Sequence, residues 1–274
     1  MNFEVSNGDI SKTAADAIVV NLFEGVTAPG GATGAVDKAL DGAISKLIAQ
    51  GDIRGKSGEI TTIHTFGTLK SPRVVVAGLG KQKDFDVDAV RNLSANLVRA
   101  LRRPGIKTVA TIAHGAGIGG LEPEACAQAV AEGALLGNYR FLKHKKAEED
   151  RAEITTVTLV EHDPAQVKAM SAAAAKGVTM AEATNLARDL ANEPSNHLTP
   201  TGIAAIAAEV ARKFKLEIEV LERDEMEKKG MGSFLSVARG SAQPPKMIRL
   251  AYRGGKGKGY DLALVGKGIT FDTG

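Results

Sequence analysis

The stretch RVVVAG (residues 73–78), followed by DVDAVRNLSANLVRAL (86–101) and TVATIA (108–113), decides the fold class. The first and third pieces are short and apolar, as buried strands are. The middle piece repeats apolar residues every three or four positions, as a helix does. Asp86 stands where a helix cap belongs, and Pro104-Gly105 ends the pattern. A helix between two buried strands predicts an α/β fold with a mostly parallel sheet.

Similar segments extend this alternation on both sides. The apolar patterns predict further strands and one further helix; the strands are 17–22, 59–65 and 154–161, and the helix is 123–136. The charged segment 140–151 is poor in apolar residues and predicts a hinge. We therefore expect a first domain over residues 1–150 and a second part over residues 151–274.

The second part begins with a long Ala-rich helix, which starts after Asp163-Pro164 and ends at Pro194. Thr199-Pro200 predicts the next helix start, with threonine as the cap and proline in the first turn. The remaining pattern predicts two strands, a short polar helix and a last interior strand; these are 216–221, 247–252, 222–229 and 261–265.

Composition limits the function classes. The chain has 35 basic and 32 acidic residues, 43% hydrophobic residues and only 4% aromatic residues without Trp. This balance is typical of a globular protein and disfavours nucleic-acid binding, which usually needs a basic face with stacking aromatic groups. Cys126 is the only cysteine, and we expect it to be a small buried residue. No signal-peptide pattern or 20-residue apolar run is present, so a cytoplasmic protein without a membrane span is expected.

Two glycine-rich loops precede predicted helices. Residues 115–120 match G-x-G-x-x-G and would suit a nicotinamide-dependent enzyme, but the next acidic strand end, Glu161, comes about forty residues later instead of about twenty. A plain strand-to-helix turn is the favoured interpretation. Residues 30–34 could bind an anion at a helix N-terminus, although a tight turn is again favoured. The five scattered histidines predict no zinc site, and no serine has a G-x-S-x-G setting.

The most informative residues end the chain, in GKGITFDTG (266–274), directly after the last predicted strand. Loops at the carboxyl ends of strands form the ligand crevice of open α/β sheets. Asp272 could bind a divalent cation through oxygen, and Lys267 could bind one through a neutral amine, which needs a pKa far below about 10.4. A surface turn is the alternative interpretation of the same pair.

Residues 265–274 closely resemble the signature loop of the leucyl aminopeptidase family, the cytosolic two-metal aminopeptidases. Supporting matches occur in the same order as in that family, at 137–141, 187–200 and 231–241. The resemblance implies a macro-like α/β N-terminal domain followed by the start of an α/β catalytic domain. It also implies cytoplasmic peptide hydrolysis at a free N-terminus by hexamers that use two divalent ions, here Mn or Zn.

Carried onto this chain, the resemblance makes Lys267 a ligand of one metal and Asp272 a bridge between both metals. The family's other ligands and its catalytic lysine and arginine lie downstream of this loop, so no catalytic residue is expected within these residues. We therefore expect a truncated aminopeptidase that is inactive alone. The alternative is a macro-like module that binds a nucleotide such as ADP-ribose without peptidase activity. The residue preference at the substrate N-terminus stays open.

Overall fold

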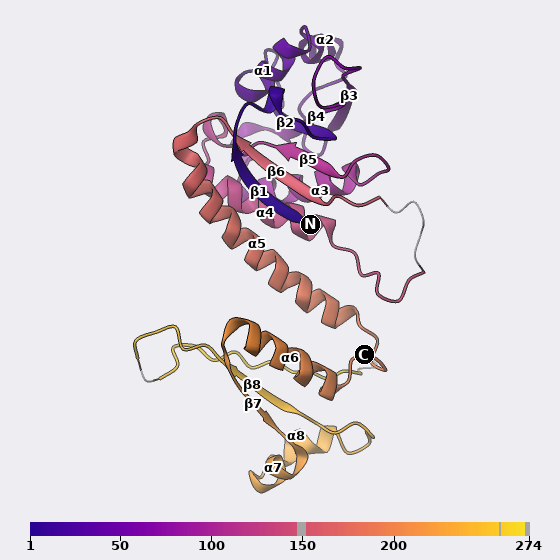
Figure 1. Cartoon of the computed structure of the whole chain (residues 1–274), viewed down its shortest axis with the longest axis vertical. Coiled ribbons are helices and arrows are strands. Elements are labelled where there is room, and N and C mark those ends of the chain that lie inside the picture. Colours follow the sequence, from indigo (N-terminus) through magenta and orange to yellow (C-terminus); the bar gives the residue numbers. More distant parts are fainter. Residues whose placement is uncertain (147–151, 258, 272–274) are drawn as a thin grey trace. The chain divides into compact units, whose positions relative to one another are not determined.

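The computed structural model describes residues 1–146, 152–257 and 259–271. The chain divides into two compact units, Met1–Leu186 and Ala187–Gly274. The predicted hinge 140–151 lies partly outside the described residues. Figure 1 labels the elements, and each unit is described by itself below.

A six-stranded sheet in the order β1-β6-β5-β2-β4-β3 organises the N-terminal unit (Figure 1). Its strands are β1 (Asn2–Asn7), β2 (Ala17–Phe23), β3 (Ile60–His64), β4 (Arg73–Gly80), β5 (Thr108–Thr111) and β6 (Thr156–Glu161). Only the β3–β4 pair is antiparallel; the other four pairs are parallel. The α/β fold with a mostly parallel sheet is therefore confirmed.

Side-chain alternation along β2 shows why both faces of the sheet are covered. Ala17 and Val19 belong to a core shared with α3 (Val87–Leu101) and α4 (Pro123–Asn138). Ile18, Val20 and Leu22 belong to a second core with α1 (Gly31–Ala39) and α2 (Ala43–Gln50). Successive residues of a strand point to opposite faces, so an almost continuous apolar strand needs a helical layer on each side. The unit thus has three layers, α/β/α.

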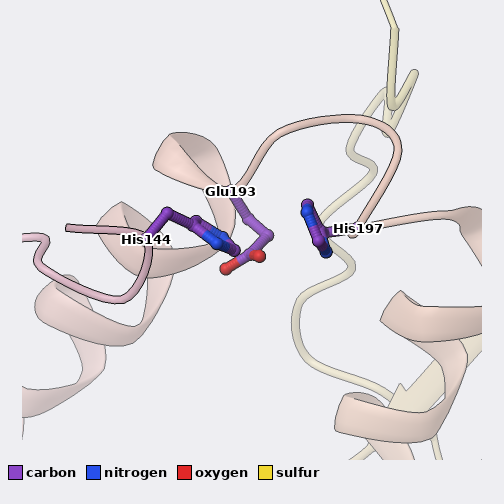
Figure 2. A group of neighbouring side chains, drawn as sticks. All are labelled: His144, Glu193 and His197. Atoms are coloured by element: carbon purple, nitrogen blue, oxygen red, sulfur yellow. The ribbon is translucent and has the colours of Figure 1, made fainter. Parts of the chain in front are cut away.

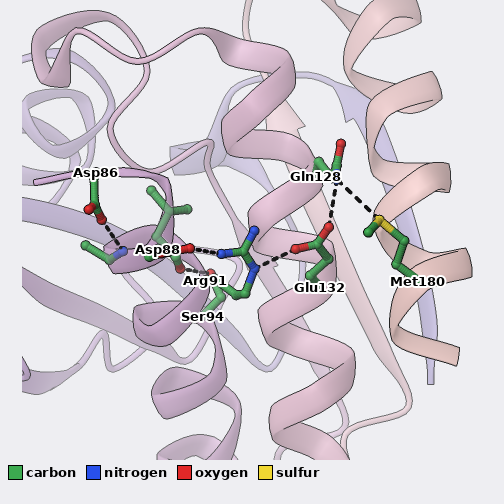
Figure 3. A network of polar contacts seen from close by, with 9 residues as sticks. Asp86, Asp88, Arg91, Ser94, Gln128, Glu132 and Met180 are labelled. Atoms are coloured by element: carbon green, nitrogen blue, oxygen red, sulfur yellow. Dashed lines mark hydrogen bonds and ion pairs between the residues drawn. The ribbon is translucent and has the colours of Figure 1, made fainter. Parts of the chain in front are cut away.

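Helices α3 and α4 approach closely because α4 carries glycines where they meet. A Cβ built on Gly133 would lie 2.1 Å from the Arg91 carbonyl oxygen. One on Gly137 would lie 2.6 Å from Ala95. Next to this contact, the Glu132 carboxylate accepts from Arg91 Nε at 2.5 Å and from Gln128 Nε2 at 2.7 Å (Figure 3). The ion pair therefore lies beside the tightest helix contact and holds its register.

The predicted helix starts are confirmed at their caps. Asp86 accepts a hydrogen bond from the Ala89 amide at the start of α3. Thr199 does the same for Gly202 at the start of α6 (Pro200–Phe214). The long helix α5 (Pro164–Asn192) begins at Pro164, and its Gly177 packs against the Gln128 carbonyl of α4.

The C-terminal unit is smaller, and its strands in the described residues are the antiparallel pair β7 (Glu217–Leu221) and β8 (Met247–Ala251). With α6 it contains two short helices, α7 (Arg223–Lys228) and α8 (Gly232–Val237). In the part that the structure describes, six hydrophobic residues of this unit are buried; they are Leu198, Ala207, Ala211, Leu221, Met226 and Ala251. No helix among the described residues has the length and apolar content to cross a membrane.

The predicted last strand, 261–265, is wrong. These residues form no strand, and Leu264 and Val265 are 88% and 98% exposed. An interior strand needs hydrogen-bonding neighbours on both sides and an apolar layer to pack on. The described part of this unit supplies only a two-stranded hairpin. Residues 261–265 therefore have neither a strand on each side nor an apolar layer to pack on.

Candidate functional site

The loop that resembles a metal site lies in an irregular, exposed segment of the C-terminal unit. Lys267 is exposed and follows the segment that was expected to be a strand. Asp272 lies outside the described residues. The assignment of both residues as metal ligands therefore stays a prediction.

Charged side chains hold the start of the segment that follows β8, called the tail below, to the β7–β8 hairpin. Arg249 pairs with Glu219 across the strands at 2.8 Å, and Arg253 pairs with Glu217 at 3.3 Å. The Tyr260 hydroxyl accepts from Arg249 Nη1 at 2.9 Å and from Arg253 Nη2 at 2.6 Å. The Arg253 guanidinium also lies 4.2 Å from the Tyr260 ring centre, a cation–π contact. The tail is thus anchored at Tyr260, seven residues before Lys267.

Figure 2 draws three side chains of metal-ligating type: His144, Glu193 and His197. Glu193 and His197 lie four residues apart in the C-terminal unit, and their ligand atoms are within 4.8 Å of each other. The Pro194 carbonyl accepts from the amides of both His197 and Leu198 at 2.9 Å, which folds this turn. His144 belongs to the N-terminal unit. A zinc ion takes three or four protein ligands, so the pair within one unit does not make a site.

The loop 115–120 forms a turn, as favoured from the sequence. It contains a 3-10 turn at Gly117–Gly119, and α4 begins only at Pro123, so the glycines do not open the helix. A Cβ on Gly115 would lie 2.4 Å from the Phe85 ring, which itself packs edge-to-face on Phe23. The Phe85 ring therefore packs directly against the loop at Gly115.

A buried histidine lies just before this loop. His114 is fully buried, with Nδ1 3.0 Å from Asn21 Nδ2 and Nε2 2.9 Å from Thr111 Oγ1. Burial lowers the pKa of His114 to about 4, so the ring is neutral at pH 7. His114 and Thr111 also line a cavity of about 20 Å³, large enough for a single water molecule.

The other loop, 30–34, leads into α1 as expected. Gly30 caps the helix without a side-chain hydrogen bond, and Thr33 Oγ1 donates to the Asn21 carbonyl at 2.6 Å. Asn21 therefore joins the start of α1 to His114, which no local sequence pattern indicates. Cys126 is buried as predicted, and burial, followed by the charge of Glu122, raises the pKa of its thiol to about 11.

Comparisons with known proteins show the protein family to which this chain belongs. The N-terminal domain profile of the cytosol aminopeptidase family matches residues 19–148, and its catalytic domain profile matches residues 185–274. The chain belongs to the cytosol aminopeptidase family. A probable cytosol aminopeptidase of Alkaliphilus oremlandii is 38% identical over all of this chain and 55% of its own length. One of Solibacter usitatus is 39% identical over all of this chain and 53% of its own length.

Solved structures agree with this assignment. The bottromycin maturation enzyme BotP in complex with Mn is 29% identical, with a TM-score of 0.69 over 87% of this chain and 45% of that chain. A mutant of tomato leucine aminopeptidase is 19% identical, with a TM-score of 0.72 over 90% of this chain and 50% of that chain, and it shows the shared fold. The chain thus spans about half the length of the relatives it matches.

Proposed function

We propose that the chain is the front part of a metal-dependent aminopeptidase that releases N-terminal amino acids, with leucine as the type substrate, from peptides. The observation that carries this proposal is the loop 266–274, which lies within the stretch matched by the family's catalytic domain. The proposed domains are residues 1–150, macro-like, and residues 151–274, the linker helix and the start of the catalytic domain.

Lys267 and Asp272 would hold the metal pair, the lysine as a ligand of one ion and the aspartate as a bridge. A carboxylate oxygen and an amine nitrogen are suitable donors for Mn or Zn, and the manganese complex of BotP supports Mn. When bound, the ions would supply a water of lowered pKa and a clamp for developing negative charge. A lysine amine binds metal only when neutral, which burial and adjacent metal charge favour. The exposed position of Lys267 lacks the burial.

By itself the 274-residue chain is proposed to bind metal weakly and to lack peptidase activity. One amine and one carboxylate leave most coordination positions of two ions without a protein ligand. Cytoplasmic location, peptide substrates with a free N-terminus and a homohexameric assembly are also proposals. They follow from the family resemblance and, for the location, from the relatives described as cytosol aminopeptidases.

A chimera tests the proposal. Residues 1–274 are joined to the segment that follows the matched region in the Alkaliphilus oremlandii relative, and Mn-dependent hydrolysis of a chromogenic leucine anilide is measured. We expect no turnover by the 274-residue chain, turnover by the chimera, and at least about 100-fold less turnover by its Lys267→Ala variant. Lys256→Ala, which removes another exposed lysine of the same tail, is the matched control. Turnover by the 274-residue chain, or full activity of the Lys267→Ala chimera, would contradict the proposal.

A nucleotide-binding N-terminal domain is the second candidate. It is supported by the adjacency of parallel strands β2 and β5, because the two glycine loops follow the carboxyl ends of these neighbours. Calorimetry of the full chain with ADP-ribose tests this function. Saturable binding would support the nucleotide-binding function. A titration that shows only the heat of dilution would contradict it.

A further inference from the structure

Three arginines gather where helices α3 and α4 end. Arg102 directly follows α3, and its Nη1 donates to the carbonyl of Asn138, the last residue of α4, at 3.1 Å. Arg99 lies three residues before Arg102, and side chains with that spacing share one face of a helix. Arg140 comes two residues after Asn138. This hydrogen bond joins the end of α3, where Arg99 and Arg102 lie, to the end of α4, which Arg140 follows by two residues.

No carboxylate of the described residues forms an ion pair with any of these three side chains. Arg99 donates to the neutral amide oxygen of Asn96 at 3.1 Å. Burial and then the charges of Arg140 and Arg99 lower the pKa of Arg102, the direction expected where like charges crowd together. The charges of the cluster are thus unopposed within the described structure.

Helix dipoles account for only part of this charge. The carboxyl end of a helix carries about half a negative charge, so the ends of α3 and α4 together offset roughly one of three positive charges. About two positive charges remain. Structural capping of the two helix ends explains Arg102, which makes the hydrogen bond, but does not require Arg99 and Arg140.

We propose that Arg99, Arg102 and Arg140 form a binding site for a phosphate-type oxyanion. Guanidinium groups are planar forks that match phosphate oxygens with two parallel hydrogen bonds each. Arg102 is half-buried and held by Asn138, whereas Arg99 and Arg140 are exposed and can turn towards a ligand. The remaining charge of about two matches a phosphate dianion. This site is independent of the proposed peptidase function and lies in the N-terminal unit.

Calorimetric titration of the 274-residue chain with inorganic phosphate, at constant ionic strength kept with sodium chloride, tests the site. We expect saturable binding, weakened at least about tenfold in the double variant Arg99→Gln, Arg140→Gln. This variant keeps Arg102 and its hydrogen bond to Asn138, so the helix ends stay joined; circular dichroism checks that it folds. O-phosphoserine, titrated in parallel, distinguishes a site for free phosphate from one that prefers a phosphate monoester.

The matched control is Arg212→Gln, Arg239→Gln, which removes two exposed arginines from the C-terminal unit and the same net charge. We expect it to bind phosphate as the unchanged chain does. Equal loss of binding in both double variants would show a general charge effect and overturn the proposal. Binding that persists in the Arg99→Gln, Arg140→Gln variant, or no saturable binding to the unchanged chain, would overturn it as well.

Discussion

His114 is a fully buried titratable side chain that lies three residues after β5, between the side chains of Asn21 in β2 and Thr111 at the end of β5. Its pKa is about 4 in the fold and near 6.5 in an unfolded chain. As pH falls, the unfolded chain therefore binds the proton first. The stability contributed by the neutral ring is complete above pH 6.5 and is lost progressively as the pH falls to about 4.

We predict that the N-terminal unit loses roughly 3 kcal/mol of unfolding free energy through His114 between pH 6.5 and pH 4. Denaturant unfolding at several pH values, followed by circular dichroism, measures the loss. His114→Asn is the comparison, because it keeps hydrogen-bonding groups but cannot take up a proton in this range. The prediction is supported if the variant is less stable at pH 7 but its unfolding free energy decreases less steeply as the pH is lowered. Parallel curves for both proteins would refute it.

Single residues were predictable where their role is local. Asp86 and Thr199 cap the helices that follow them, because a cap acts on an amide only three residues away. Asn21 and His114 could not be paired from the sequence, since 93 residues separate them and the sheet order brings β2 beside β5. Lys267 and Asp272 were recognised by resemblance alone, and Asp272 lies outside the described residues.

The α3–α4 contact makes an element-scale prediction. Gly133→Ala places a Cβ within 2.1 Å of the Arg91 carbonyl oxygen and must push the two helices apart. The higher helix propensity of alanine does not offset this overlap. We expect destabilisation by about 2 kcal/mol or more, measured as a lower unfolding midpoint.

Gly8→Ala is the control for this prediction. The same change occurs there in the same unit, with the nearest atom, of Val160, at an ordinary 3.6 Å. Its expected effect is within about 1 kcal/mol. Equal stability of the Gly133→Ala variant and the unchanged chain would show that the helices can separate without cost.

Elements with strong periodicity were predictable, and elements that depend on their surroundings were not. Helices α3, α4, α5 and α6 follow their apolar spacing and proline signals. The edge strand β1 is half-exposed, so its pattern does not mark it. The run 261–265 has the composition of a buried strand, but the described part of the C-terminal unit offers it no neighbouring strand. Composition sets a tendency, and pairing partners decide the outcome.

At the scale of the whole molecule, exposed apolar surface is distributed unevenly. Of the large hydrophobic side chains that are exposed in the described residues, Phe66, Met180 and Leu186 lie in the N-terminal unit and thirteen lie after Leu186. The last group includes Val237, Tyr252, Leu262 and Phe271. The N-terminal unit buries two cores, whereas six hydrophobic residues are buried in the described part of the C-terminal unit.

We therefore predict that the 274-residue chain unfolds in two steps, with the C-terminal unit first. Few buried apolar contacts mean a low local unfolding free energy. Limited proteolysis is expected to remove most of the segment after Leu186 while the N-terminal unit persists, as followed by mass spectrometry. Addition of a hydrophobic dye is expected to give fluorescence that falls once this segment is removed. A single cooperative transition, or cleavage spread evenly along the chain, would contradict this prediction.

The pairing of β1 has a consequence for synthesis on the ribosome. β1 lies at the edge of the sheet, and its partner is β6, about 150 residues later in the chain. At about 5–20 residues per second, β1 waits roughly 8–30 seconds for its partner to be translated. Strands β2 to β5 are complete before that. The strand of this sheet that leaves the ribosome earliest is thus among the last to join the sheet, and during that interval its hydrogen-bonding edge is available to chaperones.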